Sequence, residues 1–168
     1  CHKNVGPAGM VIIIIRNDMF NRYRLNIPLL LNFTEIMKHN SMLNTPPVFN
    51  IYMAGMTFSK LLHLGGLYEV KKNNIIKARL FYDVIDSSNG FYSYRMTPRH
   101  KSLMNIPFML KEKELEDRFL IEANIRGLKG LRGHISVGHC RASLYNALPM
   151  ESVVKLVNFM EWFHKQNK

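Results

Sequence analysis

The amino-terminal stretch CHKNVGPAGMVIIIIR (residues 1–16) decides how we interpret the rest of the chain. It places Lys3 immediately before a Gly-Pro-Ala-Gly turn, and the turn leads into an uninterrupted apolar run. Gly6 and Gly9 allow the backbone to turn sharply, and Pro7 fixes φ between them. Such a turn can hold one lysine in a fixed place, and a lysine kept partly out of water is a usable nucleophile toward an aldehyde cofactor. On this motif alone, a solvated surface lysine is the commoner alternative.

Composition limits the class of protein. The 168 residues are 47% hydrophobic and 21% charged, which suits one globular domain or a piece of a larger one. The net charge of +11 can favour anionic partners, but no basic run with interleaved aromatic residues is present. We therefore expect no nucleic-acid binding and keep a basic binding module only as a third hypothesis.

Cysteine spacing and hydropathy limit the compartment, metal sites and membrane partners that we expect. Cys1 and Cys140 have neither disulfide-scaffold nor zinc spacing, so we expect a reduced compartment, a cytoplasmic location and no metal site. No apolar run is long enough for a transmembrane helix, so we expect no membrane partner. The sequence opens on Cys1 within a structured motif, which we interpret as a partial sequence with its targeting signals unreadable.

Periodicity predicts the elements. Residues 10–16 form a β-branched apolar run that predicts a strand buried on both faces, whose neighbouring strands must come from elsewhere. Apolar spacing predicts helices over residues 48–64, 67–86, 112–126 and 150–165, and strands over 91–95, 104–110, 134–137 and 140–144. Pro107 is expected to place its strand at an edge or a bulge. From residue 67 onward, this order indicates a compact α/β unit with a small sheet covered by helices.

Three further motifs follow the first in order: SMLNTPP (41–47), MNIPF (104–108) and GHISVGHCRASLYNA (133–147). Together the four resemble the phosphoserine aminotransferases, class-V, fold-type I enzymes that depend on pyridoxal phosphate, and the likeness covers essentially the whole chain. The resemblance implies the C-terminal half of such an α/β, aspartate aminotransferase-like enzyme. Residues 1–66 would end the large cofactor-binding domain, and residues 67–168 would form the small C-terminal α/β domain.

The resemblance also implies roles for residues near the start of the chain. Lys3 matches the lysine that forms the Schiff base with pyridoxal phosphate and transfers the proton during catalysis. His2 stands where the family has a glutamine near the cofactor phosphate. Asn44 and Thr45 match the pair that binds the cofactor phosphate of the neighbouring subunit, which implies a homodimer.

The third motif is expected to bind substrate. Arg141 matches the arginine that binds the substrate α-carboxylate, a task suited to a planar guanidinium. His134 matches a histidine at the site for the substrate's phosphate or side-chain carboxylate. The family reads Gly-His-Arg-Ser-Val-Gly-Gly here, so Ile135 replaces an arginine and His139 replaces a glycine. Losing the arginine should weaken phosphate binding by ~10–100-fold. His139 is otherwise expected to be a surface or packing residue.

The resemblance implies amino transfer between O-phospho-L-serine and 2-oxoglutarate, with glutamate as the other amino acid, in L-serine biosynthesis. The alternative is an inactive fragment or pseudogene-like product, because the groups that the family uses to stack on and protonate the pyridine ring are not assignable here. We expect the isolated chain to lack transaminase activity.

Overall fold

The computed structural model describes residues 3–20, 22 and 26–167. The chain divides into two compact units, Cys1–Lys60 and Leu61–Lys168, which are considered separately below. The expected boundary between residues 66 and 67 stays a prediction. None of the helices in the described ranges is both long and apolar enough to cross a membrane.

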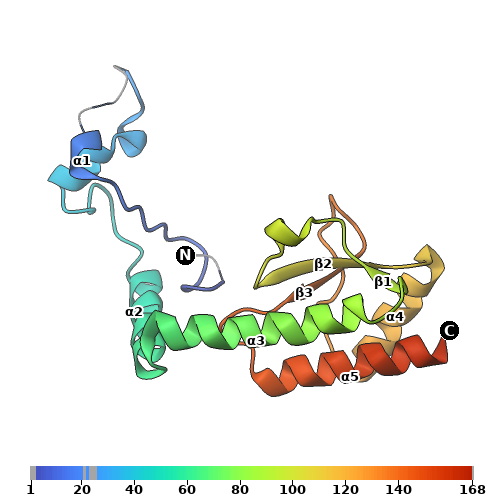
Figure 1. The fold of residues 1–168 in the computed structure, drawn as a ribbon. Helices are drawn as coiled ribbons and strands as arrows, with labels where there is room; N and C mark the ends of the chain where they lie inside the picture. The colour runs from blue at the N-terminus through green and yellow to red at the C-terminus, as the bar shows by residue number, and fades with distance from the viewer. Residues whose placement is uncertain (1–2, 21, 23–25, 168) are drawn as a thin grey trace. The chain divides into compact units, whose positions relative to one another are not determined.

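The second unit is a small antiparallel sheet packed on helices. Its elements in order are α3 (Gly66–Asp86), β1 (Tyr92–Ser93), the 3-10 helix η3 (Pro98–His100), β2 (Asn105–Leu110), α4 (Lys113–Ile125), β3 (Cys140–Ser143) and α5 (Met150–Gln166). The strand order is β1-β2-β3, and both pairings are antiparallel. Figure 1 shows α3 and α5 running side by side along the sheet. The four long helices expected from the sequence, α2 to α5, are present within one or two residues of their predicted bounds.

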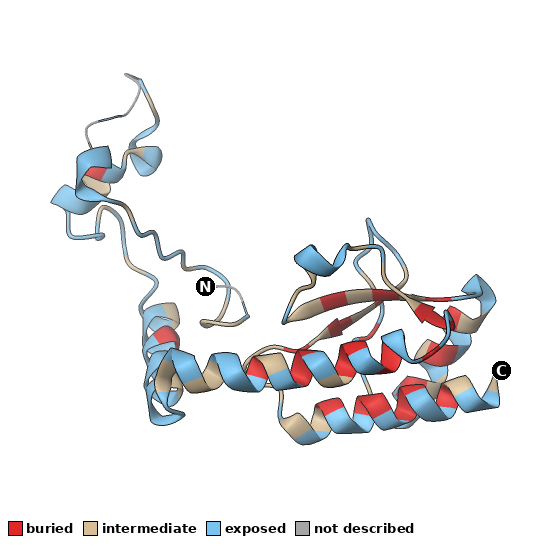
Figure 2. Cartoon of the chain, viewed as in Figure 1, coloured by how far each residue is buried: buried red, intermediate tan, exposed pale blue. Residues whose placement is uncertain are grey.

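Burial alternates along β2 and β3 between buried and half-buried residues, as Figure 2 shows along β2. The sheet therefore has a packed face and a half-buried face, which we call the open face. On β2, Ile106 and Phe108 are buried and pair with Ala142 and Cys140 of β3. The intervening residues are half-buried and lie on the other face. This alternation places Arg141, on β3, on the open face of the sheet.

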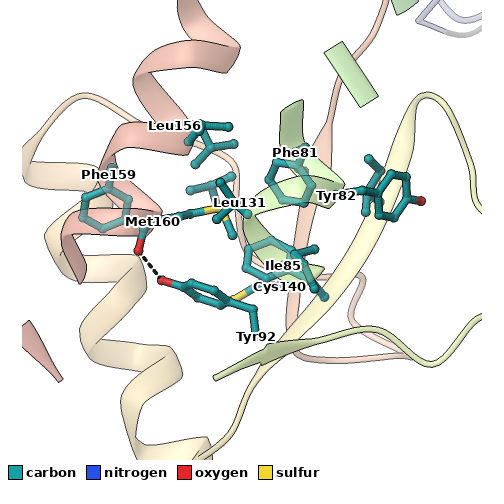
Figure 3. Packing of buried hydrophobic residues seen from close by; sticks show 14 of the residues in the cluster. Phe81, Tyr82, Ile85, Tyr92, Leu131, Cys140, Leu156, Phe159 and Met160 are labelled. Atoms are coloured by element: carbon teal, nitrogen blue, oxygen red, sulfur yellow. Dashed lines mark hydrogen bonds between the residues drawn. The ribbon is translucent and has the colours of Figure 1, made fainter. Parts of the chain in front are cut away.

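Aromatic side chains fill the core between sheet and helices (Figure 3). Phe119 of α4 makes edge contacts with Tyr92 and Phe108 at centroid distances of 6.1 and 5.8 Å. The Tyr92 hydroxyl donates to the Met160 carbonyl at 2.9 Å, which joins β1 to α5. Burial raises the pKa of Tyr92, so this hydroxyl remains a donor.

Two buried polar residues of α3 hold the segment that precedes α5. The Lys77 ammonium donates to the carbonyls of Tyr145 and Leu148 at 2.8 and 3.2 Å. Asn74 donates to Asn146 at 2.8 Å. Burial lowers the pKa of Lys77, because the charged form loses its hydration. The burial of this lysine was not predicted from the sequence.

Three predictions about the strands of the second unit need correction. Residues 134–137 form a turn instead of a strand, and β1 is shorter than the expected 91–95. Pro107 lies in the central strand, not in an edge strand or bulge. It is tolerated there because β1 pairs only with Leu110 and Met109, so at Pro107 the sheet is paired on the β3 side alone.

The first unit contains short elements and much exposed apolar surface. Its elements are η1 (Asn17–Met19), η2 (Leu29–Leu31), α1 (Phe33–Lys38) and the greater part of α2 (Val48–His63). The Asn32 side chain begins α1 by accepting hydrogen bonds from two backbone N–H groups. Among the described residues of this unit, only Thr34 and Ala54 are buried.

The expected strand at residues 10–16 is absent, and its side chains are largely exposed. The pattern is that of a strand buried on both faces, but a strand requires neighbours with which to form hydrogen bonds. No strand of the described residues lies beside this run. The segment therefore has the side chains typical of a buried strand, but it makes no backbone hydrogen-bond ladder with another strand of the described residues.

Candidate active site

The Gly-Pro-Ala-Gly turn packs on helix α2. The side chain of Asn50 donates a hydrogen bond to the Ala8 carbonyl. Gly9 has φ of +103°, and a Cβ there would lie 2.7 Å from the Asn50 amide nitrogen. Gly6 has φ of +146°, and a Cβ would meet Ala54 at 3.6 Å. Gly9 is therefore required by both its backbone conformation and its close approach to α2.

Lys3 begins this turn. Its backbone N–H donates to the Gly6 carbonyl at 3.0 Å, and its φ of +77° lies in the left-handed region, which is uncommon for a residue with a side chain. The lysine is exposed, so the expected shielding of its amine from water is not found within the described residues. Unusual backbone conformations of this kind are often kept at functional sites.

Asn44 and Thr45 lie in the same unit, immediately before the Pro-Pro pair that precedes α2. Both are exposed. Asn44 lines a groove of about 880 Å³ whose other walls include Ile13 and Phe33. The remaining cofactor residue expected from the sequence, His2, lies outside the described residues.

The two candidate substrate residues share one hairpin of the second unit. Arg132 pairs with Cys140 in an isolated antiparallel bridge. The Gly133 N–H donates to the His139 carbonyl at 2.8 Å. A Cβ on Gly133 would lie 1.9 Å from the Gly138 carbonyl oxygen, so only glycine fits. We call residues 131–141 the substrate hairpin.

His134 sits in the turn of the substrate hairpin and is exposed. Its carbonyl accepts from the N–H groups of Val137 and Gly138 at 2.9 and 2.8 Å. Its Nδ1 lies 3.3 Å from the Ser136 N–H, which can only donate, so Nδ1 accepts and the ring proton belongs on Nε2. Nε2–H is then the donor available to a ligand. Ile135 is 99% exposed, so its apolar side chain has no packing role.

Arg141 follows on β3, paired with Pro107. Its Nε is buried and has no hydrogen-bond acceptor among the described residues. A buried donor without a partner is uncommon, because its desolvation is uncompensated. The Arg141 Nε–H is therefore a buried donor that no group among the described residues satisfies.

Sequence reasoning missed the Glu116–His139 contact. Glu116 of α4 is buried, although glutamates are mostly exposed in folded proteins. Its Oε1 lies 2.8 Å from His139 Nδ1. His139 has φ of +57°, which explains why the family places glycine there. The Cys140 thiol is buried beside this pair, and burial raises its pKa to about 12.

The structure thus groups the described candidates in two sets. Lys3, Asn44 and Thr45 belong to the first unit, and His134 and Arg141 belong to the substrate hairpin of the second. The first set offers an amine and neutral hydrogen-bonding groups, which suit an aldehyde and a phosphate. The second offers a cation and an imidazole donor, which suit an anionic amino acid.

Comparison with known proteins identifies relatives along the whole chain. A phosphoserine aminotransferase of Lysinibacillus sphaericus is 46% identical over 166 residues, covering 99% of this chain and 46% of that protein. The solved phosphoserine aminotransferase of Bacillus circulans subsp. alkalophilus is 42% identical, with a TM-score of 0.93, and the match covers 99% of this chain and 46% of that one.

A phosphoserine aminotransferase from Trichomonas vaginalis, solved with bound pyridoxal phosphate, is 38% identical with a TM-score of 0.76. That match covers 82% of this chain and 39% of the other. The chain thus spans about half the length of the relatives it matches, as the resemblance implied. Its α/β fold is that of the corresponding part of these pyridoxal phosphate-dependent enzymes. Residues 1–156 match the aminotransferase class-V family, and the chain belongs to that family.

Proposed function

We propose that the protein containing this chain is a phosphoserine aminotransferase that moves an amino group between O-phospho-L-serine and 2-oxoglutarate in serine biosynthesis. The observation that carries this proposal is the buried Arg141 Nε, which has no acceptor among the described residues. The relatives at 44–47% identity are phosphoserine aminotransferases, which supports the same assignment.

Arg141 is assigned to the α-carboxylate of the amino acid. A guanidinium and a carboxylate can form two parallel charge-assisted hydrogen bonds, and these fix the orientation of the substrate. Pro107 and Arg141 are paired between β2 and β3 and lie on the same, half-buried face of the sheet, opposite the face that packs on the core. Binding would also give the buried Nε its missing acceptor.

His134 is assigned to the phosphate or the distal carboxylate. Its Nε2–H can donate to an anionic oxygen, and the hydrogen bonds within the turn hold the ring. The arginine of the family would add a cation beside this imidazole, but here that position is Ile135. We therefore expect weaker binding of phosphate than in relatives that have the arginine.

The residues of the first unit fit pyridoxal phosphate chemically. Lys3 would hold the cofactor through its primary amine, which can react with an aldehyde with loss of water, and Asn44 and Thr45 would supply uncharged groups that can hydrogen-bond to phosphate. When bound, the cofactor draws electrons away from the substrate Cα and makes its C–H bond acidic. Lys3 Nζ is then the base that receives the Cα proton and returns it.

We further propose a homodimer, with Asn44 and Thr45 serving the cofactor of the neighbouring subunit, and a cytoplasmic location. A sedimentation measurement on the complete protein tests the first part. Fractionation of the producing cells tests the second.

The decisive experiment uses a hybrid in which this chain replaces the matching half of the Lysinibacillus sphaericus enzyme. Glutamate-dependent turnover is measured, and borohydride reduction with pyridoxal phosphate followed by peptide mapping locates the labelled lysine. We expect turnover, labelling at Lys3 and its loss in Lys3→Ala. Arg141→Ala should raise the KM for O-phosphoserine by ~10–100-fold, because charge-assisted hydrogen bonds are lost.

Arg132→Ala is the matched control for Arg141→Ala. Arg132 lies in the same hairpin, but its pairing with Asp117 is exposed, so we expect no change in KM. A folded, cofactor-loaded hybrid without turnover would refute the proposed function. Turnover that survives Lys3→Ala would refute the role of that residue.

A second candidate is a fragment without catalysis of its own. The observation that favours it is the first unit, where Lys3 is exposed and few residues are buried. We expect the isolated chain to show no transamination even with added pyridoxal phosphate. Clear turnover by the isolated chain would exclude this candidate.

A further inference from the structure

The substrate hairpin is attached to α4 at both of its strands. On one strand, an Arg132 guanidinium nitrogen lies 3.0 Å from the Asp117 carboxylate. On the other, His139 Nδ1 lies 2.8 Å from Glu116 Oε1. The two acidic residues are consecutive on the helix, so one turn of α4 carries both attachments.

The two attachments differ in burial. The side chains of Arg132 and Asp117 are 71% and 75% exposed, and exposed ion pairs contribute little. The side chains of His139 and Glu116 are only 29% and 11% exposed. A carboxylate removed from water needs a hydrogen-bond donor, so the second attachment is the stronger constraint.

The backbone of His139 makes this attachment possible. Its φ of +57° lies in the left-handed region, which residues with a side chain seldom occupy. An ionised carboxylate can only accept, so His139 Nδ1 is the donor to Glu116. The position that the resemblance assigns to glycine therefore carries a side chain that ties the hairpin to α4.

A short series of hydrogen bonds connects this attachment to His134. The His139 carbonyl accepts from the Gly133 N–H at 2.8 Å, which closes the turn at its base. Within the turn, the His134 carbonyl accepts from Val137 and Gly138. Arg141, two residues beyond His139, donates its backbone N–H to the Leu131 carbonyl at 2.7 Å.

We propose that Glu116 is a positioning residue for substrate binding. Acting through His139, it fixes the substrate hairpin so that His134 and Arg141 hold their places relative to each other. This inference rests on the proposed function in one respect, namely that these two residues bind the substrate. Glu116 itself touches neither substrate nor cofactor.

The first test is amide hydrogen exchange in the 168-residue chain at Val137 and Gly138, whose N–H groups donate to His134. Glu116→Ala should accelerate this exchange about tenfold, whereas Glu116→Gln, which keeps an acceptor oxygen, should stay within about threefold. Asp117→Ala is the matched control and should have no effect. In a His139→Gly background, Glu116→Ala should add nothing further.

Two outcomes of the exchange experiment would overturn the proposal. One is equal acceleration by Glu116→Ala and Asp117→Ala. The other is parallel acceleration at core amides of α5 such as Met160, which would show that Glu116 merely stabilises the fold.

The second test measures steady-state kinetics in the hybrid enzyme. Glu116→Ala should raise the KM for O-phosphoserine about tenfold with kcat within twofold, and Glu116→Gln should restore most of the affinity. An unchanged KM in an active hybrid would overturn this inference and leave the proposed function intact. If the unsubstituted hybrid is inactive, the proposed function fails, and the exchange result decides on the positioning of the hairpin.

Discussion

Replacing Gly133 with alanine should cost stability through a steric clash and not through backbone strain. A Cβ at this position would lie 1.9 Å from the Gly138 carbonyl oxygen and 2.8 Å from the His139 carbonyl oxygen. An ordinary contact needs at least 3.4 Å, so one strand of the hairpin must move by about 1.5 Å. That movement would break the Gly133–His139 hydrogen bond, which is 2.8 Å long.

The expected cost combines two contributions. Overpacking of a constrained site costs about 1–3 kcal/mol, and a lost hydrogen bond adds about 1 kcal/mol. We therefore expect Gly133→Ala to lower the free energy of unfolding of the second unit by roughly 2–4 kcal/mol. Urea unfolding followed by tryptophan fluorescence measures this, because the chain has a single tryptophan, Trp162, in α5.

Gly138→Ala separates the clash from the backbone contribution. Gly138 has φ of +74°, but a Cβ there would meet nothing within 4 Å. Its replacement should cost only about 1 kcal/mol, from the left-handed conformation. The reasoning fails if Gly133→Ala is as stable as the unsubstituted chain or costs no more than Gly138→Ala.

Four further predictions follow from individual residues. In a Cys1→Ser background, the Cys140 thiol should not react with a disulfide reagent at pH 8 until guanidinium unfolds the chain, because its pKa is about 12. Rapid reaction of the thiol in the folded chain would contradict this. Burial lowers the pKa of Lys77, so at alkaline pH the unfolded chain binds more protons at this residue than the folded chain does. The free energy of unfolding should therefore increase as the pH rises toward 10.5. Lys77→Met should abolish this pH dependence in unfolding curves. Ile135→Arg should tighten binding of O-phosphoserine by the hybrid ~10–100-fold. Stability should not change, because the side chain is exposed. If the variant and the unsubstituted hybrid bind O-phosphoserine equally well, the hairpin does not bind the phosphate. Limited proteolysis of the isolated chain should cut within residues 1–60 first and leave 61–168, and early cleavage in α5 would disprove this.

The helices of the second unit could be predicted because their apolar spacing reflects their packing. On α5 the apolar residues Val153, Leu156, Val157, Met160 and Phe163 follow helical spacing, and all five are buried. Helix bounds also agree, since glycine and proline mark several of them. These are local signals, and local signals determine helices well.

Contacts between distant residues could not be predicted. Charged residues of a helix usually face solvent, yet Glu116 is buried against His139, which lies 23 positions away. Lys77 is buried for a similar reason, because carbonyls 68 and 71 positions away accept its hydrogen bonds. Nothing in the periodicity of either helix carries that information.

The strand errors have two different causes. Residues 134–137 contain β-branched side chains, but Gly133 and Gly138 flank them and close a turn in which the His134 carbonyl accepts two hydrogen bonds. The flanking glycines were the available signal. Residues 10–16 have the composition of a buried strand but no neighbour among the described residues, and a strand cannot satisfy its backbone alone.

The two sets of candidate residues lie in units that bury very different numbers of residues. His134 and Arg141 belong to a unit with a continuous aromatic and aliphatic core, so the substrate hairpin is held by packing within the chain itself. Lys3, Asn44 and Thr45 belong to a unit in which only Thr34 and Ala54 are buried among the described residues. Burial of apolar surface is the main source of folding free energy, so the first unit gains little from its own contacts. The geometry of His134 and Arg141 can therefore be examined in the isolated chain, whereas Lys3, Asn44 and Thr45 require the hybrid, in which their exposed apolar neighbours can be covered.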